Sequence, residues 1–130
     1  MVARAHVLHN VQEILNTASR IYRSVFGIRN SKLPIIMAHV AESELDDAVP
    51  DVNIVRLPTP TLYLEFYTVH GSVRLFLEYL YALSKAVKMR VVAIVRADKV
   101  PWTEQECERL SNYYGFRYRK EGNAHIFELV

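Results

Sequence analysis

The hydrophobic positions along the chain switch between the periods of helices and strands, and this pattern predicts an α/β fold. After Asn10, apolar residues recur every three or four positions until Gly27, which predicts an amphipathic helix with a cap at each end. The isoleucine-rich run Leu33 to Val40 predicts a buried strand, and Val52 to Leu57 is a candidate for another. Between these two runs the chain is acidic, as is typical of a solvated loop or helical turn.

The second half of the chain alternates more clearly between strands and helices. Leu62 to Val69 is rich in aromatic residues and predicts a strand, and Gly71 and Ser72 mark a turn after it. Val73 to Met89 has helical spacing, and Arg90 to Arg96 is a β-branched run typical of a strand covered on both faces. Two strands separated by a helix of this length predict a parallel β-α-β crossover.

The last third of the chain carries strong signals for the ends of its elements. Thr103 and Glu106 form a capping box, and Gly115 supplies the positive φ that closes the helix which follows. Arg117 to Lys120 and Ala124 to Val130 are two extended segments on either side of a Gly-containing turn, so they predict a hairpin. The predicted fold class is therefore α/β, or α+β, with a single mixed central sheet flanked by helices.

Composition and charge limit the classes of function that the chain can have. A chain of 130 residues that is 51% apolar fits one domain with a sizeable core. Its formal net charge is +2 and its sixteen basic residues are scattered, so we expect no specific nucleic-acid partner and no membrane partner. Cys107 is the only cysteine and is expected in the core, and no apolar run reaches the roughly 20 residues of a membrane span. These features favour a cytoplasmic, intracellular protein.

From Thr61 to Val130 the order of elements resembles the cofactor half of the GNAT acyltransferase superfamily. In that family a central strand leads through a phosphate-binding turn to a helix, a diverging strand and a short helix that ends in Gly-Phe, here Gly115-Phe116. The segment Val73-Arg74-Leu75-Phe76 also looks like the start of the cofactor helix in small phage-encoded GNAT-like proteins. The resemblance implies one GNAT-like domain over residues 1–130, with 61–130 as its cofactor half and 1–60 weakly matched.

The resemblance also implies a cofactor and a site. Acetyl-CoA or CoA would bind with its phosphates at the turn that leads into the helix. The residues of that turn are His70, Gly71, Ser72, Val73 and Arg74. Glu65, in the middle of the preceding strand, would be the base that deprotonates an amine. The alternative for this carboxylate is a cross-strand arginine partner or solvent.

Two features of the family pattern are missing. Phe66 and Val69 occupy positions where the family turn has Arg or Gln and a glycine, so the backbone approach to a pyrophosphate is restricted. Ser111 occupies the position of the family's acidic tyrosine, and a serine hydroxyl is too weak an acid to protonate a thiolate. The expected chemistry is therefore incomplete.

Three functions follow as alternatives. The first is an acyl-CoA-dependent N-acyltransferase. The second is a GNAT-like fold without catalysis that acts as a structural or interaction module, in a virion or an assembly if the chain is phage-encoded. It would bind a partner protein or form a homo-oligomer through the helix 73–89, whose Leu75, Tyr79 and Tyr81 carry apolar surface outside its main stripe. The third is an unrelated small α/β binding domain. The histidines lack ligand spacing, so no metal is expected.

Overall fold

A computed structural model describes residues 10–29, 32–41 and 60–129 of the chain, and it confirms the α/β fold class. Helices lie against one mixed sheet of five strands, in the order β1-β2-β3-β5-β4. The elements are α1 (Val11–Phe26), β1 (Ile35–Ala41), β2 (Thr61–Phe66), α2 (Val73–Val87), β3 (Arg90–Arg96), the 3₁₀ helix η1 (Ala97–Lys99), α3 (Glu104–Tyr114), β4 (Phe116–Glu121) and β5 (Ala124–Leu129). The predicted strand 52–57 and the acidic segment before it lie outside the described residues.

The sheet combines parallel and antiparallel pairs. Strands β2 and β3 are parallel and are joined by α2, as the predicted crossover requires. Strand β1 is antiparallel to β2, and β5 lies between β3 and β4, antiparallel to both. The hairpin β4–β5 closes between Glu121 and Ala124 through Gly122, whose φ is +58°. The predicted crossover and hairpin are both confirmed.

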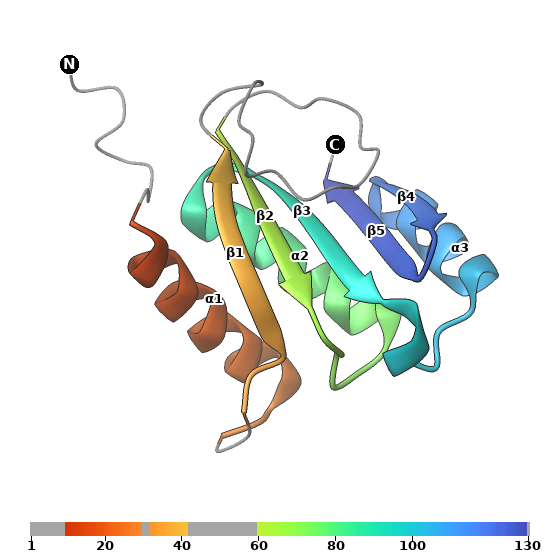
Figure 1. Cartoon of the computed structure of the whole chain (residues 1–130), viewed down its shortest axis with the longest axis horizontal. Helices are drawn as coiled ribbons and strands as arrows, with labels where there is room; N and C mark the ends of the chain where they lie inside the picture. The colour runs from red at the N-terminus through yellow and green to blue at the C-terminus, as the bar shows by residue number, and fades with distance from the viewer. Residues whose placement is uncertain (1–9, 30–31, 42–59, 130) are drawn as a thin grey trace.

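All three helices cover the same face of the sheet, and α2 is the middle one (Figure 1). The main apolar core lies in this layer, where Leu62, Leu64 and Phe66 of β2 are buried beside residues of α1, α2 and α3. Their neighbours in β2 point to the opposite face, because side chains alternate along a strand. A smaller apolar cluster lies on that opposite face. It consists of Ala41, Tyr63, Val92, Ile94 and Ile126. None of the described helices is long and apolar enough to cross a membrane.

Local capping explains where the helices begin and end. The Asn10 side chain accepts hydrogen bonds from two amides of the first turn of α1. The Ser72 hydroxyl caps α2, and the Thr103 hydroxyl caps α3. Gly27 and Gly115 take the left-handed conformation that ends α1 and α3. The caps predicted at Asn10, Gly27, Thr103 and Gly115 are confirmed, and Ser72, predicted only as part of a turn, is a further cap.

Two elements were predicted to end later in the sequence than they do. Helix α2 ends at Val87, because Lys88 adopts a left-handed conformation with φ of +58°. Strand β2 ends at Phe66, three residues earlier than predicted: the Tyr67 N–H still donates to Pro34 C=O at 2.8 Å, but the proline has no N–H with which to continue the pairing. Thr68 then donates through its hydroxyl to Lys99 C=O at 2.7 Å. The segment after β2 is therefore a tertiary connection, not a strand.

Candidate functional site

The turn between β2 and α2, predicted to hold the cofactor phosphates, is tied to helix α1 through His70. The backbone N–H of His70 donates to the Tyr22 hydroxyl at 2.9 Å, and the same hydroxyl lies 2.8 Å from Nδ1 of the imidazole. Burial raises the pKa of Tyr22 to about 12, although the His70 amide acts in the opposite direction. The phenol is therefore neutral at physiological pH, and it occupies two of the polar groups of His70.

Gly71 and its neighbours also have packing roles. A Cβ at Gly71 would lie 2.9 Å from Cε1 of Phe26, so only glycine lets α1 approach the turn this closely. The Gly71 carbonyl accepts a hydrogen bond from the Trp102 indole at 3.1 Å. Ser72 caps α2, and Val73 is buried in the core. Of the five residues predicted to bind the cofactor, only Arg74 combines an exposed side chain with no described structural contact.

Strands β2 and β3 leave no gap for a cofactor within their described lengths. They pair without interruption from Thr61 with Arg90 to Phe66 with Val95. Beyond the last pair, the hydrogen bond from Thr68 to the Lys99 carbonyl joins the two connections that follow these strands. The described lengths of β2 and β3 therefore lack the divergence between strands that the family resemblance implies.

The sheet separates the two residues predicted to be catalytic. Glu65 is on the face away from the helices, where it lines a pocket of about 390 Å³ together with Ile94 and Arg96. Ser111 is fully buried on α3, in the layer on the other face. Its hydroxyl forms no hydrogen bond within the described part of the chain. The expected base and the serine at the position of the family's tyrosine therefore lie on opposite faces of the sheet.

Cys107 lies in a buried polar cluster next to Ser111. Its Sγ is 3.8 Å from Nδ1 of His125, and the Tyr118 hydroxyl lies 2.6 Å from the same nitrogen. Cys107 has no exposed surface, and burial raises the pKa of its thiol to about 12. A thiol that stays protonated and inaccessible is not a nucleophile. The prediction that Cys107 belongs to the core is confirmed.

His125 makes the stability of this cluster depend on pH. Burial lowers the pKa of its imidazole, the charge of Lys120 acts in the same direction, and Glu104 opposes both. In the unfolded chain the pKa is about 6.5, so the unfolded state binds the proton first as the pH falls. We expect the melting temperature to fall as the pH is lowered from 7.5 through this value, and the fall to be smaller in His125→Gln. Equal slopes for the two proteins would contradict a buried neutral His125.

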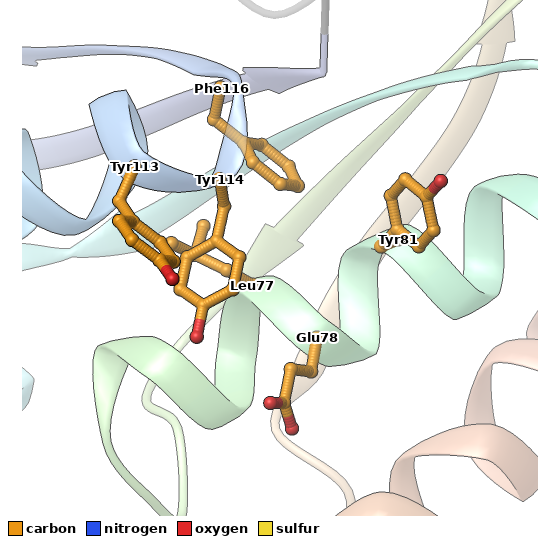
Figure 2. A pocket seen from close by; sticks show the side chains of 6 residues that line it. All are labelled: Leu77, Glu78, Tyr81, Tyr113, Tyr114 and Phe116. Atoms are coloured by element: carbon orange, nitrogen blue, oxygen red, sulfur yellow. The ribbon is translucent and has the colours of Figure 1, made fainter.

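A pocket of about 460 Å³ lies between α2 and α3 (Figure 2). We call it the tyrosine pocket. Its lining residues are Leu77, Glu78, Tyr81, Tyr113, Tyr114 and Phe116. Tyr113 is 80% exposed and Tyr81 is 49% exposed, which are large values for aromatic side chains. The lining is mainly apolar, and the tyrosine hydroxyls add hydrogen-bonding groups.

The fold holds the walls of the tyrosine pocket firmly. Tyr113 and Tyr114 are the last two residues of α3, and their rings pack edge to face with centroids 4.9 Å apart. Gly115 then turns the chain so that Phe116, which is 4% exposed, enters the core below them. In Figure 2 the Phe116 ring lies between Tyr114 on one side and Tyr81 on the other. The pocket thus has a buried floor and an exposed aromatic rim.

The sequence interpretation found this surface only in part. It assigned apolar surface outside the main stripe of α2 to Leu75, Tyr79 and Tyr81, as a surface that a partner could cover. Tyr79 is instead fully buried, and its hydroxyl donates to the Ala18 carbonyl of α1 at 3.0 Å. Helix α1 therefore covers much of the apolar surface of α2, and Tyr81 is what remains exposed. The Tyr113-Tyr114 pair just before Gly115 was the one available signal, but only the packing of α3 on α2 shows that it faces Tyr81.

Two kinds of site can thus be compared. Apart from the exposed Arg74, the residues predicted for acyl transfer lie on opposite faces of the sheet or are used in packing, whereas the tyrosine pocket is accessible and is lined by residues of α2, α3 and β4. Comparisons of the chain with protein-family models, curated proteins and solved structures found no match, so its function has to be inferred from this geometry.

Proposed function

We propose that this chain is a protein-binding module that holds a segment of a partner in the tyrosine pocket. The observation that carries the proposal is the exposure of Tyr81 and Tyr113 around an apolar floor. Tyrosine is enriched at protein interfaces, where a ring gives a large contact area at a low cost in conformational entropy. An exposed aromatic rim of this kind marks an interaction surface more often than it marks ordinary solvent-facing helix.

The shape of the pocket favours a protein segment over a small metabolite. Small-molecule sites usually bury 70 to 90% of their ligand in an enclosed cleft. Here Tyr113 leaves most of its ring exposed even though it lines the pocket, so a ligand confined to the hollow would leave this ring uncovered. A peptide that crosses the rim would cover Tyr81 and Tyr113 together.

Acyl transfer is less well supported. It would need a gap between β2 and β3, which are paired throughout, and a proton donor on the same side of the sheet as Glu65. The order of elements from 61 to 130 is compatible with a GNAT-like origin. A GNAT-like fold without transferase activity would therefore agree with both the resemblance and the site.

Selection from a phage-displayed library of random 12-residue peptides tests the proposal. We expect selected peptides to bind the wild-type chain and to lose at least tenfold in affinity for Tyr81→Ala/Tyr113→Ala, because both walls of the pocket are removed. Tyr67→Ala is the matched control, since Tyr67 is a tyrosine that is 43% exposed but follows strand β2 and does not line the tyrosine pocket. Peptides that bind the double variant and the wild type equally would contradict the proposal.

A second measurement addresses the alternative function. A ligand at 100 times its dissociation constant stabilises a fold by about 2.7 kcal/mol, which a thermal-shift assay detects easily. We expect no shift with millimolar acetyl-CoA or CoA. A clear shift that Arg74→Ala abolishes would instead support an acyl-CoA site at the turn before α2.

A further inference from the structure

A second hollow adjoins the tyrosine pocket at the C-terminal end of α2. Its volume is about 440 Å³, and Tyr81 lines both hollows, so the two share this side chain as a wall. The other lining residues are Ser84, Lys85, Lys88, Met89, Arg90 and Leu129. We call it the basic hollow, because three of its described lining residues are cations and none of those described is an acid.

The cations of the basic hollow are placed to meet a bound segment. Lys85 is exposed, and its Nζ lies 4.5 Å from the centre of the Tyr81 ring. Lys88 is exposed at the left-handed cap of α2. Arg90 is partly buried and donates from Nη1 to the Leu129 carbonyl at 3.1 Å, which fixes the guanidinium at the edge of the hollow. A segment that contacts Tyr81 therefore lies within reach of positive charge.

Two negative features oppose this charge, and both are smaller. The C-terminus of α2 carries the negative end of the helix dipole, equivalent to about half a charge. Glu78 lies one turn before Tyr81, in the tyrosine pocket and away from the lysines. Among the lining residues, the basic hollow therefore carries three cations and the tyrosine pocket one carboxylate, so the two hollows differ in charge.

From this arrangement, and resting on the proposed function, we infer that the partner segment places an apolar anchor in the tyrosine pocket and acidic residues in the basic hollow. The helical rise of about 1.5 Å per residue puts Lys85 about 6 Å and Lys88 about 10 Å beyond Tyr81. An extended peptide advances about 3.3 Å per residue. Acidic residues two or three positions from the anchor would therefore meet the two lysines.

A second copy of the chain fits the basic hollow poorly. A two-fold contact centred there would bring Lys85 and Lys88 of both copies together, because a two-fold axis pairs each surface with itself. Like charges in such an interface oppose association. An acidic segment of a different protein has the complementary charge. Exposed pairs of this kind act more on specificity and association rate than on total affinity.

The same peptide library, panned on the wild type and on Lys85→Glu/Lys88→Glu, tests the inference. The wild type should enrich peptides with an apolar anchor and Asp or Glu two or three positions away, and the charge-reversed variant should enrich Lys or Arg there. A selected acidic peptide should lose at least tenfold in affinity on the variant, and its binding to the wild type should weaken between 50 and 300 mM salt. Arg20→Glu/Arg23→Glu on α1 makes the same change in net charge at exposed positions elsewhere and should leave the affinity unchanged.

The outcomes separate the two proposals. Peptides that depend on Tyr81 and Tyr113 but show no acidic preference, and bind the lysine variant normally, would overturn the acidic partner and leave the protein-binding function intact. An absence of any peptides that depend on the tyrosines would overturn both. If sedimentation shows a dimer of the wild type that Tyr81→Ala abolishes, the occupant of the two hollows is a second copy of the chain, and the inference of an acidic partner is wrong.

Discussion

Phe76→Ala is expected to lower the free energy of unfolding by about 3 to 5 kcal/mol, the usual cost of removing a fully buried phenylalanine. Phe76 has no exposed surface, and its ring packs against four aromatic rings, that of Tyr79 on the same helix and three from other parts of the chain. The centroid distances are 5.0 Å to Phe66, 5.5 Å to Trp102 and 5.6 Å to Phe127. The loss would leave a cavity where α2, the sheet and the segment before α3 meet.

Urea unfolding followed by circular dichroism measures this loss, with Tyr81→Ala as the control on the same helix. Tyr81 is half exposed, so its removal should cost less than about 1 kcal/mol. Phe76→Leu keeps an apolar side chain and should be intermediate, which protects the test if the alanine variant does not fold. A cost below 1 kcal/mol for Phe76→Ala would mean that this aromatic core is not packed as described.

The parts of the fold that the sequence predicted well are those set by neighbouring residues. Asn10 and Thr103 bind amides within three residues of themselves, and Gly115 has a conformation that its own lack of a side chain permits. These signals are local, so no knowledge of the fold is needed to find them. The β-α-β crossover was predictable for a similar reason, because element order and length limit the ways in which two strands can pair.

The errors occurred where distant residues decide the structure. The end of β2 depends on Pro34 and Lys99, which accept hydrogen bonds from Tyr67 and Thr68 but lie about 30 residues away in either direction. Residue patterns near Phe66 carry no trace of these partners. Because the hydrophobic and aromatic residues continue beyond Phe66, the predicted strand was three residues too long.

The candidate site shows the same limit. His70 and Gly71 were interpreted as phosphate-binding residues, yet their contacts are with Tyr22, Phe26 and Trp102. A glycine that is required because a ring packs against it looks the same in sequence as one required by a ligand. The tyrosine pocket could not be predicted either, since it exists only because α3 packs beside α2.

Arg119→Ala is expected to destabilise the fold by about 3 kcal/mol, because it would leave the buried carboxylate of Glu128 without its closest cation. Glu128 has no exposed surface and accepts from Arg119 Nη1 through Oε1 at 2.7 Å. This destabilisation is at the low end of the range for removing one partner of a buried ion pair, since 27% of the Arg119 side chain is exposed. Arg119 also holds Glu121 at 3.3 Å, a partly exposed contact that adds less than the bond to Glu128.

Two further variants show whether the unpaired charge is the cause. Arg117→Ala should cost less than about 1 kcal/mol, because Arg117 is 47% exposed and its Nη1 lies 3.8 Å from the other Glu128 oxygen. Glu128→Gln in the Arg119→Ala background should recover part of the loss, since a neutral amide is cheaper to bury than a carboxylate without a partner. Urea unfolding of the wild type, Arg119→Ala, Glu128→Gln and the double variant completes a double-mutant cycle. If Glu128→Gln adds to the loss instead of offsetting it, packing by Arg119, and not its charge, holds β4 against β5.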